Sequence, residues 1–151
     1  MASGSFDRAF VSSRSPAECW TVLTDVDQLA SWVDIVRDVT VHAPLASYGA
    51  TLEDRVGPFS LRADLDVSVT EAEEPRRVMF EASGQDRQVG SRLHIRAGMD
   101  LERSGDVGTR VRFSGTYAVE GRVATLGAPM IHRKAAAILE KFTARAEQEL
   151  R

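Results

Sequence analysis

Residues 59–69 alternate strictly between apolar and polar side chains. Successive side chains point to opposite faces of a strand, so this alternation predicts a half-buried β-strand. The apolar positions are Phe59, Leu61, Ala63, Leu65, Val67 and Val69. Further strands are predicted at residues 6–11, 38–43, 50–56, 78–82, 93–101 and 111–119. Polar, glycine-containing segments at residues 84–90 and 104–108 predict hairpin loops between the later strands.

A long amphipathic helix is predicted over residues 122–150. Its apolar residues recur every three or four positions, which is typical of a helix that packs one face on a core. They are Val123, Leu126, Met130, Ile131, Ala135, Ile138, Leu139, Phe142 and Leu150. Gly127 and Pro129 interrupt the beginning of this pattern, so we expect a kink or a late start there.

Two short helices are predicted after the first strand. Residues 15–18 read Ser-Pro-Ala-Glu, which combines a capping box with proline at the first helical position. The helix that follows carries Cys19, Trp20 and Leu23 on one side and is expected to bury them. It should end near Asp25, and a second short helix should span residues 26–31.

The predicted element order favours an α+β fold with an antiparallel sheet of about seven strands. Parallel strands alternating with helices are absent from the pattern, so consecutive hairpins are the economical arrangement. Seven strands make a sheet roughly 34 Å wide, whereas one helix with its side chains is about 10 Å across. The sheet must therefore curl around the long helix, which leaves room for a pocket.

Length and composition limit the class of protein to which this chain can belong. The chain has 151 residues, which suits a single domain over residues 1–151. A formal net charge of −3 without a basic cluster argues against a nucleic-acid partner. The single cysteine excludes an internal disulfide, and no apolar stretch approaches the ~20 residues of a transmembrane helix. Residues 1–5 lack the features of a secretory signal, so a cytoplasmic location is expected. Composition predicts no oligomeric state.

Two sets of residues resemble a known superfamily. Residues 16–36, with Trp-Thr-Val-Leu-Thr-Asp at 20–25 and Leu-Ala-Ser-Trp at 29–32, resemble the opening of the START-like helix-grip superfamily, also called SRPBCC, whose fold is Bet v 1-like. Several turn motifs resemble its carbon monoxide dehydrogenase G-subunit branch. These are Gly57-Pro58, Asp86-Arg87, Gly90-Ser91-Arg92, Gly108-Thr109-Arg110 and residues 121–127. The resemblance implies a curved antiparallel sheet wrapped around the C-terminal helix.

The same resemblance implies an accessory role beside molybdenum-containing hydroxylases such as carbon monoxide dehydrogenase. The resemblance also allows peripheral contact with a membrane. An isoprenoid quinone is then a natural ligand, because such enzymes must pass electrons onward.

The residues themselves offer little for catalysis. A hydrolase needs a nucleophile beside a base, or a metal with several ligands, and neither arrangement is visible. His94 alternates with apolar neighbours and should face outward, while Cys19 is expected to act as a small buried apolar residue. We therefore predict no catalytic residue, no metal site and no cofactor.

Two charged residues fit poorly among the inward-facing apolar positions. Asp54 lies between Leu52 and Val56 on the predicted buried face, and Lys134 lies within the apolar stripe of the long helix. A buried unpaired charge costs several kcal/mol, so each should pair, line a wet cavity or reach the rim. His132 follows Ile131 and is placed to meet a ligand carbonyl. Asp54 and His132 are the candidate polar anchors for a ligand.

The predicted pocket wall is apolar. Small inward residues alternate with large ones, which either leaves volume unfilled or reflects interdigitated packing with the helix. The expected wall residues are Leu65, Phe80, Leu93, Ile95, Phe113, Met130 and Ile138. Trp32 and Val36, placed on the short helical segment, are expected to form a mobile lid.

The sequence favours non-enzymatic binding or carriage of an apolar small molecule of lipid or quinone type. Two alternatives remain. One is a polyketide cyclase or dehydratase that uses Asp54 or His132 as acid or base in the same cavity. The other is an interaction module with a filled core.

Overall fold

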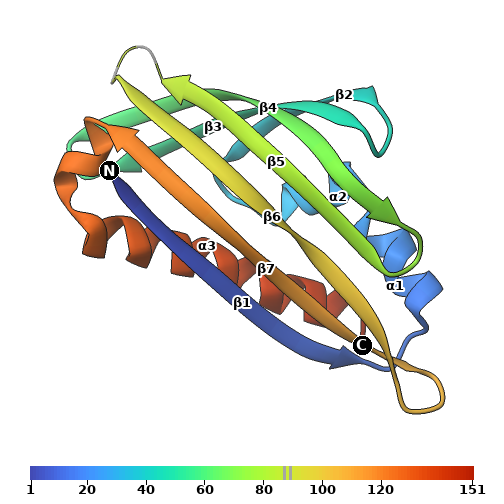
Figure 1. Ribbon diagram of the computed structural model, residues 1–151. Coiled ribbons are helices and arrows are strands. Elements are labelled where there is room, and N and C mark those ends of the chain that lie inside the picture. Colours follow the sequence, from blue (N-terminus) through green and yellow to red (C-terminus); the bar gives the residue numbers. More distant parts are fainter. Residues whose placement is uncertain (87, 89) are drawn as a thin grey trace.

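Seven strands form one antiparallel sheet in the computed structural model, which describes residues 1–86, 88 and 90–151. Its order is β1-β7-β6-β5-β4-β3-β2, so that the first and the second strands of the chain lie at opposite edges (Figure 1). The strands are β1 (Ala2–Ser12), β2 (Val36–Ala43), β3 (Ser47–Val56), β4 (Phe59–Glu73), β5 (Arg77–Asp86), β6 (Ser91–Ser104) and β7 (Gly108–Gly121). All seven predicted strands and the α+β helix-grip class are confirmed.

The inner face of the sheet carries the apolar positions of the alternating pattern. In the β4–β5–β6 pairing, Val67 lies opposite Ala82, which in turn lies opposite Ile95. Irregular register in β2 and between Val69 and Glu71 of β4 marks β-bulges. Bulges increase local twist and bend a sheet, which helps this one curve around the helix.

One predicted loop is shorter than expected. Residues 84–86 belong to β5, because they continue its ladder with β6 as far as the pair Asp86 and Ser91. Of the remaining loop, residues 87 and 89 lie outside the described part of the chain.

Each of the two short helices begins at a side-chain cap, which the sequence predicts for the first. Helix α1 (Pro16–Leu23) starts after Ser15, whose hydroxyl accepts the backbone N–H of Glu18 at 3.2 Å. Helix α2 (Val26–Ser31) starts after Asp25, whose carboxylate accepts the N–H of Gln28 at 3.3 Å. Each cap satisfies a donor that a helix start otherwise leaves unpaired.

The long helix starts late, as Gly127 and Pro129 predict. Residues 123–126 form a separate 3-10 turn, η1 (Val123–Leu126), and helix α3 (Ala128–Glu149) follows. Between them Gly127 has a φ of 95° and a ψ of 149°, a conformation that is nearly restricted to glycine. Pro129 lies in the first turn of α3, where its missing N–H breaks no helical hydrogen bond.

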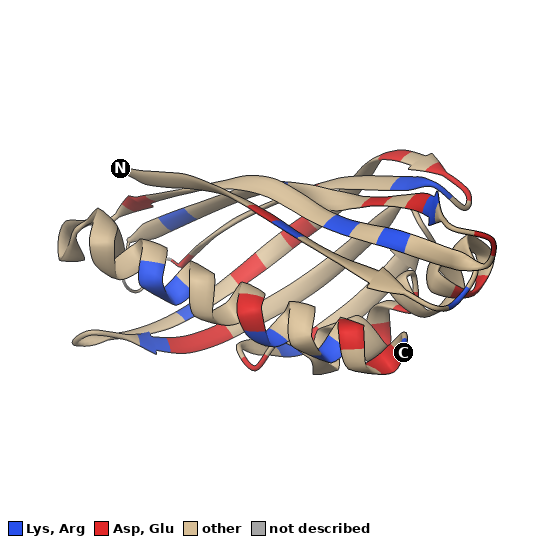
Figure 2. Ribbon diagram, turned by 90° about the horizontal axis from the view of Figure 1, so that it is seen from below, with Lys and Arg blue, Asp and Glu red and all other residues tan. Residues whose placement is uncertain are grey.

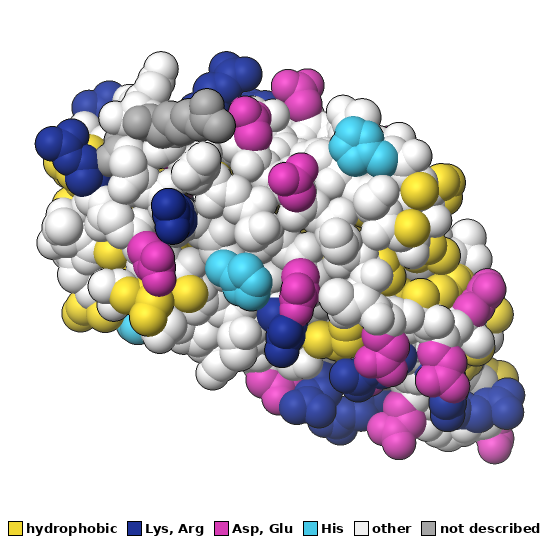
Figure 3. Space-filling view, turned by 45° about the horizontal axis from the view of Figure 1, so that its top comes forward, with side chains coloured by type: hydrophobic (Ala, Val, Ile, Leu, Met, Phe, Trp, Pro, Cys, Tyr) yellow, Lys and Arg dark blue, Asp and Glu magenta, His cyan; other side chains and the backbone are white. Residues whose placement is uncertain are grey.

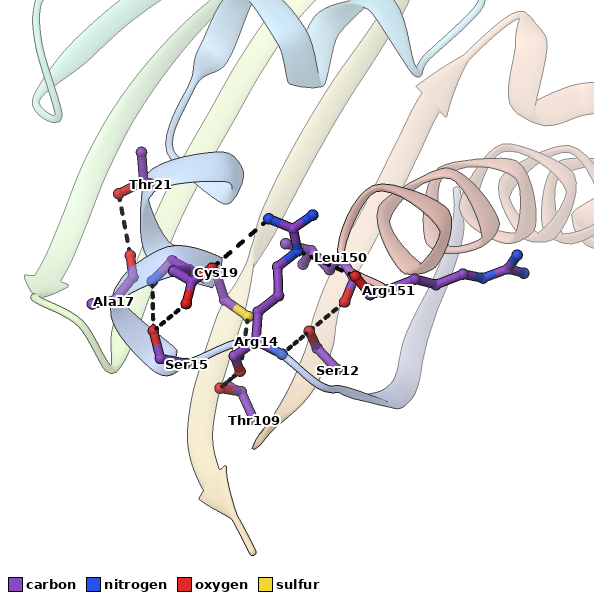
Figure 4. Close-up of polar contacts among 10 residues, drawn as sticks. Ser12, Arg14, Ser15, Ala17, Cys19, Thr21, Thr109, Leu150 and Arg151 are labelled. Carbon is purple, nitrogen blue, oxygen red and sulfur yellow. Dashed lines mark hydrogen bonds and ion pairs between the residues drawn. The ribbon is translucent and has the colours of Figure 1, made fainter. Parts of the chain in front are cut away.

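The end of β1 and the start of β7 lie beside the C-terminal end of α3. The Ser12 hydroxyl donates to the carbonyl of Leu150, and the Thr109 hydroxyl donates to that of Arg14 at 2.7 Å (Figure 4). Beside them, Trp20 and Leu23 of α1 are 5% and 4% exposed, as predicted. They belong to a core cluster that also contains Phe10, Cys19, Trp32, Met99, Leu101, Val111, Phe113, Ala146 and Leu150.

Helix α3 crosses the concave side of the sheet and lies nearest β1 (Figure 1). Inner-face residues farther from it are only half-buried, including Val67, Phe80, Leu93 and Ile95. One helix therefore does not cover the whole inner face, as the widths of the two elements predict. None of the helices in the described part of the chain is both long and apolar enough to cross a membrane.

Candidate functional site

A groove of about 610 Å³ lies between α3 and the edge of the sheet. One wall is α3, and the other is formed by the connection from α2 to β2 and the end of the β3–β4 hairpin. Its apolar lining consists of Trp32, Val33, Ile35, Leu61, Ala137 and Ile138.

The groove exists because β2 begins late. The last β2–β3 pair joins Val36 and Leu52, and just beyond it the N–H of Glu53 donates to the carbonyl of Ile35 at 2.8 Å. Residues 54–56 of β3 therefore continue without a β2 neighbour in the described ladder. This free edge, with the chain that crosses from α2, forms a notch opposite α3.

Two ion pairs cross the groove from α3. The Lys134 ammonium lies 2.7 Å from a carboxylate oxygen of Asp54 on β3, and that of Lys141 lies 2.8 Å from Asp34, which follows α2. Lys134, Ile138 and Lys141 share one face of α3, so the apolar side chain lies between the two cations. Figure 2 shows that α3 carries both basic and acidic positions along its length.

The ion pair between Lys141 and Asp34 stabilises the charged forms of both side chains. The hydrogen bond from Lys141 lowers the pKa of Asp34, and the same bond raises the pKa of Lys141. Both side chains are 71% exposed, so solvent screens this pair strongly.

Asp54 is the more enclosed carboxylate, with a side chain 17% exposed. One oxygen pairs with Lys134, and the other accepts the backbone N–H of Arg55 at 2.8 Å. Asp54 thus satisfies a backbone donor of residue 55, next to the point where β2 begins. Asp54 and Lys134, the two inward charges expected to need a partner, pair with each other.

The rim of the groove carries charges that the sequence pattern did not assign to a site. Glu53 contacts Arg62 at 2.9 Å and Arg37 at 3.6 Å. Together five basic and three acidic side chains line the groove. The sequence pattern indicates only that these side chains are exposed to solvent, because the notch that gathers them depends on where β2 begins.

The predicted site residues divide between the groove and its surroundings. Trp32, Asp54 and Ile138 line the groove. Behind it, Leu65, Phe80, Leu93 and Ile95 lie in one cluster on the inner face together with Val36 and Ile35. Ile35 lines the groove as well, so the groove and this cluster are continuous.

Val36 and Trp32 occupy different elements. Val36 is the first residue of β2, paired with Leu52, and so does not lie on a short helical segment as expected. Trp32 follows α2 directly and is 5% exposed. Its ring lies 5.6 Å from that of Phe142, which lies 5.2 Å from Phe113. Phe113 therefore belongs to the aromatic core beyond the groove.

Met130 and His132 lie near the beginning of α3, outside the residues that line the groove. The His132 Nδ1 shares a hydrogen bond with the Tyr117 hydroxyl, and burial raises the pKa of Tyr117. A Cβ atom at Gly4 would lie within 3.0 Å of both side chains, so the glycine leaves room for the pair.

The outer face of the sheet differs from the groove in character. Basic and acidic side chains are interspersed on it (Figure 3). Cross-strand pairs include Arg112 with Asp7 and Arg96 with Glu81, as expected for a solvated face. His94 is exposed there, as predicted, in a depression of about 210 Å³. In the described part of the chain, no group of three or more potential metal ligands is present.

Solved structures show the same fold. A conserved protein from Geobacillus kaustophilus matches with a TM-score of 0.82 and 18% identity, over 97% of this chain and 95% of that one. A START superfamily protein from Mycobacterium smegmatis gives 0.67 and 14%, over 97% and 96%. The Zhui aromatase/cyclase from a Streptomyces species gives 0.65 and 14%, over 99% and 96%. At these identities the likeness concerns the fold alone.

A family model provides the closer assignment. A search of curated protein sequences gave no significant match. The family model for the carbon monoxide dehydrogenase G-subunit, CoxG, matches residues 9–151, nearly the whole chain. The chain therefore belongs to the carbon monoxide dehydrogenase CoxG family and has the START-like helix-grip fold.

Proposed function

We propose that this protein binds and carries an apolar small molecule of lipid or quinone type, without converting it chemically. The observation that supports this is the groove of about 610 Å³, whose apolar wall continues into the half-buried cluster on the inner face. This volume is within the ~300–1,000 Å³ range of small-molecule sites. The apolar part of a ligand would lie against Trp32, Leu61 and Ile138.

The family supports a finer version of this proposal. The family description names carbon monoxide dehydrogenase, so the carrier would act as an accessory to a molybdenum hydroxylase of that type. It would do so in the cytoplasm, with peripheral contact to a membrane. An isoprenoid quinone suits this setting, because the enzyme must pass its electrons to an acceptor.

Substitution of the apolar wall tests the carrier. Ile138→Glu places a charge against the apolar lining, which is unfavourable for an apolar ligand. The affinity for decylubiquinone or a single-chain lipid, measured by calorimetry, should fall at least about tenfold. Val107→Glu is the matched control, because Val107 is 70% exposed in the β6–β7 turn. Absence of any ligand binding to the wild-type protein would contradict the proposal and favour the filled interaction module.

A polyketide cyclase or dehydratase is the second candidate. The observation in its favour is that Asp54 lies in the groove wall beside Lys134, 2.7 Å apart, where one acid or base would meet a bound substrate. The test incubates the protein with a linear polyketide mimic and follows its mass. Recovery of unchanged mimic supports the carrier, whereas a cyclised or dehydrated product that is lost in Asp54→Asn supports the enzyme.

A further inference from the structure

One polar pair interrupts the apolar wall of the groove. Lys134 of α3 and Asp54 of β3 lie 2.7 Å apart, and both side chains line the groove. Their neighbours on the same faces are apolar. Leu61 lies directly opposite Asp54 in the β3–β4 ladder, and Ile138 follows Lys134 by one helical turn. Leu61 and Ile138 line the groove as well, so a ligand that lies against them meets the pair.

The pair can still both donate and accept hydrogen bonds. A carboxylate has about four acceptor positions, and the Asp54 carboxylate accepts the N–H of Arg55 at 2.8 Å and pairs with Lys134. An ammonium has three N–H donors, of which the contact with Asp54 uses one. The side chains of Asp54 and Lys134 are 17% and 40% exposed, so neither is closed off from the groove. A bound molecule can thus accept from Lys134 and donate to Asp54.

The charges of the pair favour a neutral head group. An anionic head would lie beside the Asp54 carboxylate and a cationic head beside the Lys134 ammonium, and like charges in contact are unfavourable. A hydroxyl carries no charge and has both a donor and acceptor lone pairs. It can therefore bridge the two side chains. A carbonyl or ether oxygen can only accept, so it engages Lys134 alone.

The packing on either side of the pair determines where an apolar chain can lie. Toward the β3–β4 hairpin, a Cβ atom at Gly57 would lie 3.2 Å from Leu126, so the hairpin packs closely on η1 there. In the other direction, Ile138 and Ile35 continue the lining, and Ile35 belongs to the half-buried cluster on the inner face. A chain attached to the head group therefore extends from Lys134 along Ile138 toward the inner face.

We infer that the ligand of this groove is a neutral amphiphile with a hydroxyl head, whose O–H donates to the Asp54 carboxylate and whose oxygen accepts an N–H of Lys134. This inference rests on the proposed carrier function and names its ligand class. Hydrogen bonds with one charged partner are roughly twice as strong as those between neutral groups, so the pair rewards a group that engages both side chains. Within the lipid and quinone type, it selects alcohols and hydroquinones over ethers, carboxylates and quinones.

The test compares decan-1-ol with its isomer methyl nonyl ether by calorimetry on the full chain. The alcohol should bind at least about tenfold more tightly, since it alone can donate to Asp54. A groove without this anchor would prefer the ether, because a hydroxyl is more costly to remove from water. Affinity for the ether equal to or above that for the alcohol would therefore overturn the hydroxyl head and leave the carrier intact. Failure of both to bind would overturn both proposals.

Charged and oxidised analogues test the head group further. Decanoate and decylammonium should each bind less tightly than decan-1-ol, since one meets Asp54 and the other Lys134 as a like charge. Tighter binding of either ion would overturn the neutral head. Decylubiquinol, kept reduced under argon, should bind more tightly than decylubiquinone, because only the quinol can donate to Asp54. The reverse order would overturn the hydroxyl head.

Asp54→Asn separates the head-group site from the rest of the groove. The amide keeps an acceptor for the N–H of Arg55 but is a weaker acceptor for a hydroxyl, so the preference for the alcohol over the ether should fall at least about threefold. Affinity for the ether should stay the same, which reports an intact groove. Asp66→Asn is the matched control, because it makes the same change at an exposed position on the outer face of β4. An unchanged preference in Asp54→Asn, or equal losses in both variants, would overturn the proposed site.

Discussion

Trp20 is the residue through which α1 is anchored. Its side chain is 5% exposed among core residues from β6, β7 and the end of α3. Trp20→Ala should lower the free energy of unfolding by about 3–5 kcal/mol, because transfer and cavity terms add. Denaturant melts measure this, with Val11→Ala at a position 63% exposed as the control. A loss below about 1 kcal/mol would show that Trp20 is not a core residue.

Tyr117 should make the free energy of unfolding decrease at alkaline pH. Burial raises its pKa above the ordinary value of 10.0, so the unfolded chain loses this proton at a lower pH than the folded protein. Stability from this group is complete below pH 10 and falls as the pH rises toward the folded pKa. Urea melts between pH 9 and about 11 should therefore show a steeper decline for the wild type than for Tyr117→Phe. Parallel declines would contradict the assignment.

Individual residues of the site were predictable to different degrees. Alternation in β3 placed Asp54 on the inner face, and helical spacing placed Ile138 beside it. The same spacing grouped His132 with them, but His132 lies near the helix start and bonds to Tyr117. Periodicity gives the face of an element and not the position along it at which a cavity opens. The rim residues Arg55 and Lys141 were missed for the same reason.

At the scale of elements, the break before α3 depends on one glycine. A residue with a Cβ atom at φ 95° and ψ 149° costs about 1–3 kcal/mol, so Gly127→Ala should destabilise the protein by that amount. Ala144→Gly within α3 is a useful comparison, because Ala144 is exposed and its cost of about 1 kcal/mol comes from helix propensity. Denaturant melts of both variants measure the difference. Unchanged stability of Gly127→Ala would mean that α3 extends smoothly into η1.

Most elements follow from local sequence because each buries one face. Period-two alternation located β4 to β7, and the capping box at Ser15 located the start of α1. Strand ends were underestimated, as at residues 71–73, because both faces are exposed there and no polarity difference marks them. The offset between β2 and β3, which opens the groove, is a tertiary property that neither strand encodes alone.

At the scale of the molecule, the expectation of a single domain over residues 1–151 predicts cooperative unfolding. Tryptophan fluorescence reports on the core around Trp20 and Trp32, whereas far-ultraviolet circular dichroism reports on the whole sheet. The two urea transitions should coincide, as they do for a two-state domain. Separate midpoints would indicate that the groove half of the sheet unfolds independently.

The pairing of β1 with β7 also determines how long β1 stays unpaired during translation. Ala2 lies opposite Val119, so β1 has no partner until nearly the whole sheet has been translated. At about 5–20 residues per second, β1 waits roughly 5–20 s. During that time β2 to β6 can pair hairpin by hairpin with strands already made. Until β7 is made, β1 is thus an unpaired strand, which is where a chaperone would protect the nascent chain.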